Sequence, residues 1–326
     1  MEKIDINEIL KDALFMDIDI EQPEPIITID NKVVATMQNF ICISGLPKSR
    51  KTTFVNYLIG AGLSGNCIFN MKVNINKNDK IILVDTEQSI FDFSKQIKLL
   101  KYAIKSQKLP DNFSAYLFRK YEPDTILNSI YILISEQRPK ILVIDNLTEL
   151  VINPNDMIES KKVIQFLKKI TAEFNLVVIC LLHLAKTNLQ TLGNLGSYTD
   201  RGAQSVLKVT LDKETQTSTL EPQLMRSDSF FNPITIYFNT DTKQYEQTTG
   251  LTEKPQKSVI NDLTDTDHYN RLGVVFRDIK ELTYSELVEN IKQVYGVGTN
   301  KVKQVIIPYL VGNKFLTANK GIYKFN

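Results

Sequence analysis

The sequence is poor in cysteine. Its three cysteines, Cys42, Cys67 and Cys180, are far apart, and two of them stand in apolar, strand-like runs. This pattern contains neither a disulfide framework nor the closely spaced pairs of a zinc site, and it is typical of buried thiols in a reducing compartment. We therefore expect a fold without disulfides or cysteine-bound zinc.

Long apolar runs are also missing. No run reaches the roughly 18 residues needed to span a bilayer, and the acidic residues 1–8 lack the hydrophobic stretch of a secretory signal. With 43% hydrophobic and 23% charged residues, the composition argues against wholesale disorder and against a fibrous fold. We expect a cytoplasmic protein that does not bind membranes.

Acidic residues are absent after Glu289. The same stretch carries six lysines, which are Lys292, Lys301, Lys303, Lys314, Lys320 and Lys324. Because the net charge of the whole chain is only +2, this basic character is local. The C-terminal end is therefore a candidate for contact with nucleic acid.

The apolar runs alternate between strand-like and helix-like patterns. Strands are predicted at residues 40–44, 80–85, 114–119, 141–145 and 176–183, and helices at 52–61, 89–108, 124–137 and 157–174. This alternation predicts an α/β fold, with a mainly parallel sheet covered by helices on both faces. Further runs at 205–211, 217–226, 233–238 and 244–248 predict antiparallel strands that extend the sheet.

The length of 326 residues suffices for a large domain and a small accessory domain. We predict a lead-in with a short helix at 1–35, the α/β domain at 36–249, a polar linker at 250–265 and a C-terminal domain at 266–326. Within the last, helices at 268–276, 282–295 and 300–311 precede a hairpin around residues 319–321, which is the order of a winged helix. Thr283 and Glu286 form a capping-box pattern at the start of the second helix.

The most informative motif follows the first predicted strand. The run Gly45-Leu-Pro-Lys-Ser-Arg-Lys-Thr52 fits three of the four fixed positions of G-x-x-x-x-G-K-[ST]. In that loop, backbone N–H groups surround phosphate, the lysine contacts the β- and γ-phosphate oxygens and the hydroxyl contacts Mg²⁺. We expect ATP and Mg²⁺ at Gly45, Leu46, Pro47, Lys48, Ser49, Arg50, Lys51, Thr52 and Thr53.

Arg50 stands where the pattern has its second glycine. If the backbone there needs a conformation that glycine adopts most easily, the arginine weakens nucleotide binding. Alternatively, Arg50 and Lys48 add positive charge beside the phosphates.

Two acids at strand ends complete the predicted catalytic site. Asp145 ends an apolar strand and is predicted to hold Mg²⁺ together with Thr52. Glu87, in the run Asp85-Thr-Glu87, is placed to orient and deprotonate the attacking water. An acid that stabilises the start of a helix is the alternative interpretation of Glu87.

The order and spacing of these motifs over roughly residues 20–248 resemble those of the RecA-like P-loop ATPases, most closely the RepA-type branch of hexameric plasmid helicases and the ATPases of mobile elements. The resemblance implies that Glu87 is the catalytic glutamate, that Lys51 contacts the phosphates, and that His183 is a polar sensor of the γ-phosphate. Arg226 is similar to one half of a Lys-x-Arg pair that reaches the γ-phosphate of a neighbouring subunit. This role implies a homo-oligomer, such as a hexamer. Residues 186–199 then form either a mobile loop facing DNA or a plain connector.

The C-terminal domain supplies the candidate contacts with DNA. These are Thr299, Asn300, Lys301, Lys303 and Lys320, at the start of the last helix and in the wing. The motifs thus predict an ATPase with a DNA-binding C-terminal domain, which acts on single- or double-stranded DNA. The resemblance implies that it is a motor, a replicative helicase or a helicase-loading ATPase of a plasmid or mobile element. Two alternatives stay open: a nucleotide-gated DNA-binding regulator with weak or no ATP turnover, and a loader or adaptor whose winged helix docks a protein partner.

Overall fold

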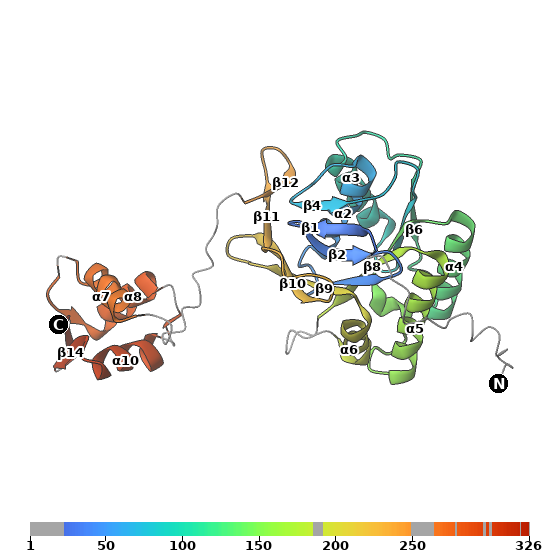
Figure 1. Ribbon diagram of the computed structural model, residues 1–326. Coiled ribbons are helices and arrows are strands. Elements are labelled where there is room, and N and C mark those ends of the chain that lie inside the picture. The colour runs from blue at the N-terminus through green and yellow to red at the C-terminus, as the bar shows by residue number, and fades with distance from the viewer. Residues whose placement is uncertain are drawn as a thin grey trace, which may run out of the picture. The chain divides into compact units, whose positions relative to one another are not determined.

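The computed structural model describes residues 23–184, 192–248, 264–277, 279–295, 298–299, 302–319 and 321–325. The chain divides into two compact units, Met1–Gln247 and Thr248–Asn326, and their elements are labelled in Figure 1. The predicted N-terminal helix lies outside the described residues, and so do residues 249–263 of the predicted linker. The last two residues of that predicted linker, Thr264 and Asp265, begin a helix instead.

Nine strands form the large sheet of the first unit. In sheet order they are β12 (Gln244–Gln247), β11 (Ile234–Asn239), β10 (Thr217–Met225), β9 (Ser205–Leu211), β3 (Phe40–Gly45), β8 (Val177–His183), β7 (Ile141–Asp145), β5 (Ile81–Asp85) and β6 (Phe113–Leu117). The strands from β9 to β6 are parallel, whereas β10, β11 and β12 form an antiparallel extension. The predicted α/β class, with a mainly parallel sheet extended by antiparallel strands, is confirmed.

Helices cover both faces of this sheet (Figure 1). One face carries α2 (Lys51–Ser64) and α3 (Ile90–Ala103), and the other carries α4 (Pro123–Gln137), α5 (Met157–Phe174) and α6 (Gly193–Gly202). Alternate side chains of a strand point to opposite faces. Ile41 and Ile43 therefore join the core beneath α2, while Cys42 joins the core beneath α5. This two-sided burial explains why the central strands are apolar at almost every position.

β9 differs from its prediction, because it pairs with β3 in parallel. A parallel neighbour requires a crossover connection, and α6, between β8 and β9, supplies it. The prediction of a loop at 186–199 is therefore wrong from residue 193 onward, where α6 begins. Residues 185–191 lie outside the described part of the chain. Gly193 and Gly196 lower the helix propensity of this segment, since glycine is a poor helix former, and the helix was therefore not predicted. Leu195 is fully buried and holds the helix against the core.

A second, small sheet packs beside the first. It consists of β1 (Pro25–Ile29), β2 (Lys32–Thr36) and β4 (Met71–Val73), antiparallel and in the order β2-β1-β4. Ile27 and Ile29 are fully buried in the core beneath α2. The lead-in predicted at 1–35 did not include this sheet, because β1 pairs with β4 across more than forty residues of sequence.

The second unit contains helices and a three-stranded sheet. Its elements are α7 (Asp265–Val275), β13 (Leu282–Thr283), α8 (Tyr284–Tyr295), a π-helical turn η3 (Val302–Ile306), α10 (Ile307–Gly312), β14 (Leu316–Asn319) and β15 (Ile322–Phe325). The strand order is β13-β15-β14. Leu272, Leu287, Ile291 and Leu310 form its core. The predicted capping box is present, because the Thr283 backbone N–H donates to Glu286 Oε2 at 2.9 Å and the Glu286 backbone N–H donates to Thr283 Oγ1 at 3.5 Å.

The last predicted helix, 300–311, is divided into η3 and α10. Pro308 lies in the first turn of α10, where its missing N–H is tolerated, but it interrupts a continuous helix. Among the described residues of both units, no helix is long and apolar enough to cross a bilayer.

Candidate active site

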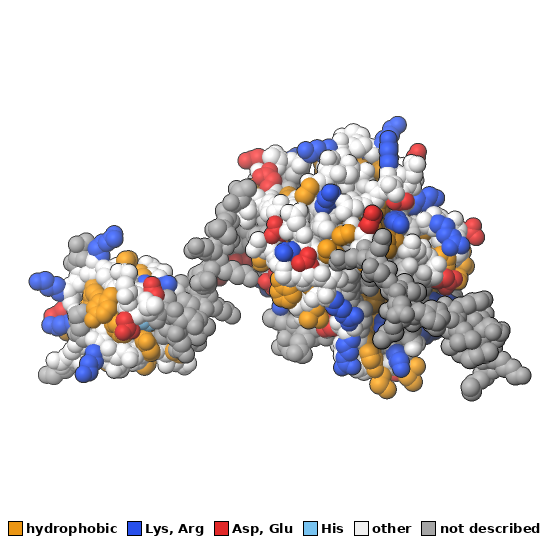
Figure 2. Space-filling model, viewed as in Figure 1, with side chains coloured by type: hydrophobic (Ala, Val, Ile, Leu, Met, Phe, Trp, Pro, Cys, Tyr) orange, Lys and Arg blue, Asp and Glu red, His pale blue; other side chains and the backbone are white. Residues whose placement is uncertain are grey.

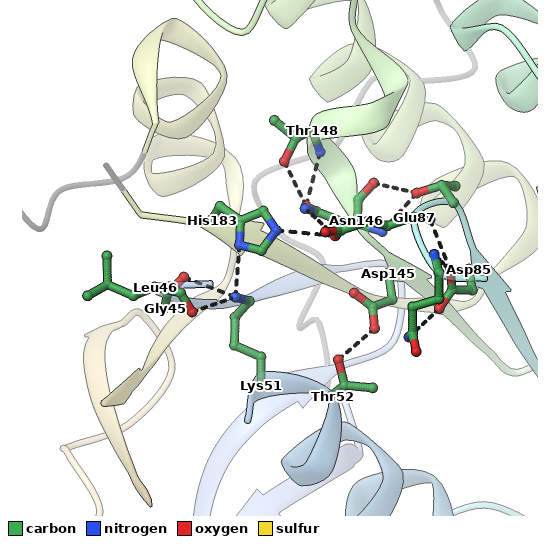
Figure 3. A network of polar contacts seen from close by, with 12 residues as sticks. Gly45, Leu46, Lys51, Thr52, Asp85, Glu87, Asp145, Asn146, Thr148 and His183 are labelled. Carbon is green, nitrogen blue, oxygen red and sulfur yellow. Dashed lines mark hydrogen bonds and ion pairs between the residues drawn. The ribbon is translucent and has the colours of Figure 1, made fainter. Parts of the chain in front are cut away.

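Four parallel strands of the large sheet end side by side with polar or small residues. Gly45 ends β3, Asp85 ends β5, Asp145 ends β7 and His183 ends β8. The carboxyl ends of parallel strands share one edge of a sheet, which is where ligands bind in open α/β sheets. Figure 3 shows the resulting network of polar contacts. Most of the predicted site residues therefore meet at one place, although they are far apart in the sequence.

Lys51 lies at the centre of this network. It is buried, with 6% of its surface exposed. Its Nζ donates to the carbonyl oxygens of Gly45 and Leu46, at 3.0 and 3.2 Å, and lies 3.0 Å from His183 Nδ1. Burial lowers the pKa of the Lys51 ammonium to about 8, against the opposing effect of the Asp145 and Glu87 carboxylates. The ammonium is thus held at the mouth of the loop by weak partners that a phosphate can replace.

Thr52 and Asp145 form the predicted metal pair. The Thr52 hydroxyl donates to Asp145 Oδ2 at 2.8 Å, next to the start of α2 (Figure 3). Burial, together with the nearby Asp85 carboxylate, raises the pKa of Asp145 to about 7. Hydroxyl and carboxylate oxygens are the hard donors that Mg²⁺ prefers. Among the described residues, no cluster of three or more His, Cys, Asp or Glu side chains offers another metal site.

The loop before α2 fits a phosphate group. A Cβ on Gly45 would lie 2.6 Å from Ser49 Oγ and 2.6 Å from the Val209 carbonyl oxygen, so only glycine allows this packing. The Ser49 hydroxyl is buried and, among the described residues, has no hydrogen-bond partner. At the start of α2, the Thr53 N–H already donates to the Arg50 carbonyl oxygen at 3.1 Å. The N–H groups of Lys51 and Thr52 precede it in the first turn, where no earlier helical turn offers an acceptor. These orphaned donors beside the Lys51 ammonium suit an anion.

Arg50 adopts the left-handed conformation that the missing glycine would favour. Its φ is 73° and its ψ is 29°. Its side chain turns to the antiparallel extension, where Nη1 donates to the Gln216 carbonyl oxygen at 2.6 Å and the guanidinium lies 5.5 Å from the centre of the Tyr245 ring. Lys48 also has a positive φ, of 64°. The loop therefore keeps its shape without the second glycine.

Glu87 lies two residues beyond the end of β5 and is held by two donors. Its Oε2 is 3.2 Å from His183 Nε2 and 3.3 Å from Asn146 Nδ2. Because His183 Nδ1 accepts from the Lys51 ammonium, His183 Nε2 carries the proton that is donated to Glu87. This hydrogen bond is the main reason that the pKa of Glu87 is lowered. Glu87 is therefore ionised and faces the same space as Lys51.

Asp85 fixes the turn that carries Glu87. Its buried carboxylate accepts from the backbone N–H groups of Glu87 and Gln88, at 3.0 and 2.7 Å, and from Gln88 Nε2 at 2.6 Å. Burial raises the pKa of Asp85, and these hydrogen bonds oppose that rise. Sequence reasoning missed this role, and it missed Asn146 as well. The available signal was an amide directly after Asp145, at the end of the neighbouring strand.

Arg226 lies apart from this site. It follows β10, whose last residue, Met225, is paired with Ser205, and Ser205 is level with Ile41 near the start of β3. Arg226 thus lies near the amino-terminal ends of the parallel strands, whereas Gly45 lies at their carboxyl ends. Its guanidinium donates to the carbonyl oxygen of Arg201. Within one chain, the structure does not bring Arg226 to the other site residues.

The predicted DNA contacts belong to the second unit. Lys303 is exposed on η3, and Thr299 is half-buried before it. Asn300, Lys301 and Lys320 lie outside the described residues. On the face of this unit that Figure 2 shows, lysine and arginine side chains lie at several points, with acidic side chains among them.

Comparisons with known proteins find similarity to solved structures. No protein-family model matches the chain, and no curated protein matches it. Among solved structures, the chain is similar to a KaiC-like protein from the hyperthermophilic archaeon Pyrococcus horikoshii OT3. The two are 16% identical, and the similarity covers 65% of this chain and 90% of that chain, with a TM-score of 0.47.

Proposed function

We propose that the chain binds ATP with Mg²⁺ and hydrolyses it, as a RecA-like motor that acts on DNA. The observation that carries the proposal is the meeting of Lys51, the Thr52–Asp145 pair and the Glu87–His183 pair at the carboxyl edge of one parallel sheet. A phosphate-binding loop, a metal pair and an ionised carboxylate are the parts that hydrolysis of a phosphoanhydride needs.

The loop residues from Gly45 to Thr53 bind the phosphates in this proposal. The Lys51 ammonium leaves the carbonyl oxygens of Gly45 and Leu46, which hold it at 3.0 and 3.2 Å, for the more strongly charged phosphate oxygens. The start of α2 adds backbone N–H groups and the positive end of the helix dipole. Ser49 contributes the buried hydroxyl that has no partner among the described residues.

Thr52 and Asp145 would hold the Mg²⁺ ion. When bound, the ion neutralises negative charge on the phosphate oxygens. Binding requires an ionised Asp145, and this carboxylate, with its pKa of about 7, is readily ionised beside a cation.

Glu87 acts as the general base. Its lowered pKa keeps the carboxylate ionised, so that it can orient the attacking water and accept its proton. His183 lies between Glu87 and Lys51, at 3.2 and 3.0 Å, and is therefore placed to respond when a phosphate draws Lys51 away. This placement supports its proposed role as a sensor.

The proposal extends to an oligomer. Arg226 lies at the opposite edge of the sheet from Gly45, so it can meet phosphate only in a neighbouring subunit. We propose that it does so in a homo-oligomer such as a hexamer, with nucleotide between subunits. The resemblance to the RepA-type branch motivates this arrangement and the biological role, which is a replicative helicase or a helicase loader of a plasmid or mobile element.

The second unit is proposed to be a winged helix that binds DNA. Its order of elements supports this, since α7, β13, α8 and α10 precede the hairpin β14–β15, and β13 pairs with β15. Lys303 is exposed on η3 before α10. A positively charged helix end can contact DNA phosphates and place side chains in the major groove.

Phosphate release from Mg²⁺-ATP by the full chain tests the proposal, with Glu87→Gln as the matched variant. We expect the variant to bind Mg²⁺-ATP within about threefold of the wild type and to lose turnover by a factor of about a hundred or more, because the amide cannot accept the proton. Stimulation by single-stranded DNA would support the motor. Binding without turnover in the wild type would contradict it and would favour the nucleotide-gated regulator.

A further inference from the structure

Asn146 lies directly after the metal-pair aspartate and is buried, with 1% of its surface exposed. Its side-chain Nδ2 donates to Glu87 Oε2 at 3.3 Å. His183 Nε2 lies 3.2 Å from the same oxygen. Both donors therefore meet one oxygen of the Glu87 carboxylate, and among the described residues none donates to the other oxygen, Oε1. The two oxygens of Glu87 are thus in different environments.

The orientation of the Asn146 amide is fixed by its other half. Asn146 Oδ1 accepts from the Thr148 backbone N–H at 3.1 Å and from the Thr148 hydroxyl at 2.8 Å (Figure 3). A backbone N–H can only donate, so Oδ1 must face Thr148 and the NH₂ group must face Glu87. The short helix η1 (Leu147–Leu150), which Asn146 caps, holds this arrangement.

The backbone of Asn146 is also tied to the segment that carries Glu87. The Asn146 N–H donates to Thr86 Oγ1 at 2.9 Å, and the Thr86 hydroxyl donates to the Asn146 carbonyl oxygen at 3.0 Å. The Thr86 N–H donates to the Asp145 carbonyl oxygen at 2.7 Å. One contact between two backbones, two contacts between the Thr86 hydroxyl and the Asn146 backbone, and the side-chain contact from Asn146 to Glu87 therefore join the ends of β5 and β7. A group held in this way loses little freedom when it reacts.

We infer that Asn146 is a positioning residue, which holds Glu87 by Oε2 so that Oε1 faces the water that attacks ATP. This inference rests on the proposed function. In the step, the water oxygen forms a bond to the γ-phosphorus while the bond from phosphorus to the β,γ-bridging oxygen breaks. ADP leaves with that electron pair, and the proton of the water passes to Glu87 Oε1 and then to solvent. His183 Nδ1 also contacts the Lys51 ammonium. The hydrogen bonds of Asn146 among the described residues go instead to Thr86, Glu87 and Thr148.

The test uses the full chain and the variant Asn146→Asp. An aspartate keeps the oxygen that accepts from Thr148 but replaces the donor toward Glu87 by a second carboxylate oxygen. We expect kcat for Mg²⁺-ATP to fall at least thirtyfold, while the dissociation constant of Mg²⁺-ATP stays within about fivefold. Thr148→Val is the matched variant. It removes only the hydroxyl contact to Asn146, and the backbone N–H of residue 148 still orients the amide, so kcat should fall much less, by about fivefold or less.

A double variant separates positioning from a merely structural role. If Asn146 acts through Glu87, adding Asn146→Asp to Glu87→Gln leaves the residual turnover unchanged within about threefold. An equal fall in both backgrounds would overturn the inference, and so would a wild-type kcat in Asn146→Asp alone. A wild-type chain without Mg²⁺-dependent turnover overturns the proposed function as well, whereas active wild type with an unaffected Asn146→Asp overturns only the positioning role.

Discussion

At Arg50 a single residue combines backbone strain with new side-chain contacts. Its φ of 73° is in the left-handed region, which costs a residue with a side chain about 1 kcal/mol or more relative to glycine. The contacts of its guanidinium with Gln216 and Tyr245 offset part of that cost. The arginine therefore keeps the loop in shape and also joins it to the antiparallel extension.

Two substitutions at this position separate the two effects. Arg50→Ala keeps the strain and loses the contacts, so we expect it to lower the free energy of unfolding by about 1 kcal/mol. Arg50→Gly loses the same contacts but removes the strain, and it should be more stable than Arg50→Ala by about 1 kcal/mol. Urea unfolding of the three proteins measures both differences. Equal stability of the alanine and glycine variants would show that residue 50 is not held in the left-handed conformation.

The buried ammonium of Lys51 gives nucleotide binding a pH dependence. Its pKa is lowered to about 8, and phosphate binds to the charged form. As the pH rises through 8, the Lys51 ammonium of the free protein loses its proton. Binding of phosphate then requires the uptake of a proton from solvent. The affinity for ADP should therefore fall by about tenfold per pH unit above 8. Titration between pH 7 and 9.5 checks this, and Lys51→Ala should bind weakly with a much flatter profile. A wild-type affinity that is constant over this range would contradict the prediction.

At the scale of elements, local signals predicted most of the first unit. Helix α5 and strand β7 occur at the predicted residues 157–174 and 141–145. Their apolar spacing and, for α5, the Asp156 cap are encoded within the segments themselves. The meeting of Lys51, Asp145 and His183 also followed from the sequence, because ends of parallel strands share an edge.

The elements that sequence reasoning missed depend on distant partners. α6 contains three glycines, Gly193, Gly196 and Gly202, and is held by the burial of Leu195 against other helices and strands. β9 is parallel because α6 returns the chain to the same edge. The contacts of Asn146 with Thr86 and Glu87 depend on the pairing of β5 with β7, which the local sequence around Asn146 does not encode. These features are determined by contacts between residues far apart in the sequence, and not by the local sequence pattern.

Helix α5 offers a direct test of the core beneath it. Leu167 is fully buried there, whereas the next residue, Lys168, is exposed. Leu167→Ala leaves a cavity and should lower the free energy of unfolding by about 2 to 5 kcal/mol. Lys168→Ala, on the same helix, should change it by less than about 0.5 kcal/mol. Chemical unfolding of both variants measures the contrast, and similar values would mean that α5 does not pack through this face.

At the scale of the whole molecule, the proposed DNA binding of the second unit predicts a strong salt dependence. The dissociation constant for a short DNA should rise steeply between about 50 and 200 mM salt, because bound phosphates release counterions. Lys303→Ala should weaken binding for all sequences and reduce the slope of log K against log salt by about one. Lys292→Ala is the matched control, since Lys292 is already paired with Glu289 at 3.3 Å. Binding that does not depend on salt would favour a docking role for this unit.

Glu87 is proposed to activate the water that cleaves ATP held by the loop at Gly45–Thr53. Single-turnover cleavage of ATP by the full chain, started by adding Mg²⁺, tests it most directly. We predict that the wild type converts bound ATP to ADP and phosphate, that chelation of Mg²⁺ stops the reaction, and that Glu87→Gln holds ATP uncleaved. Cleavage by Glu87→Gln at the wild-type rate, or bound ATP that stays intact in the wild type, would show that Glu87 does not have this role.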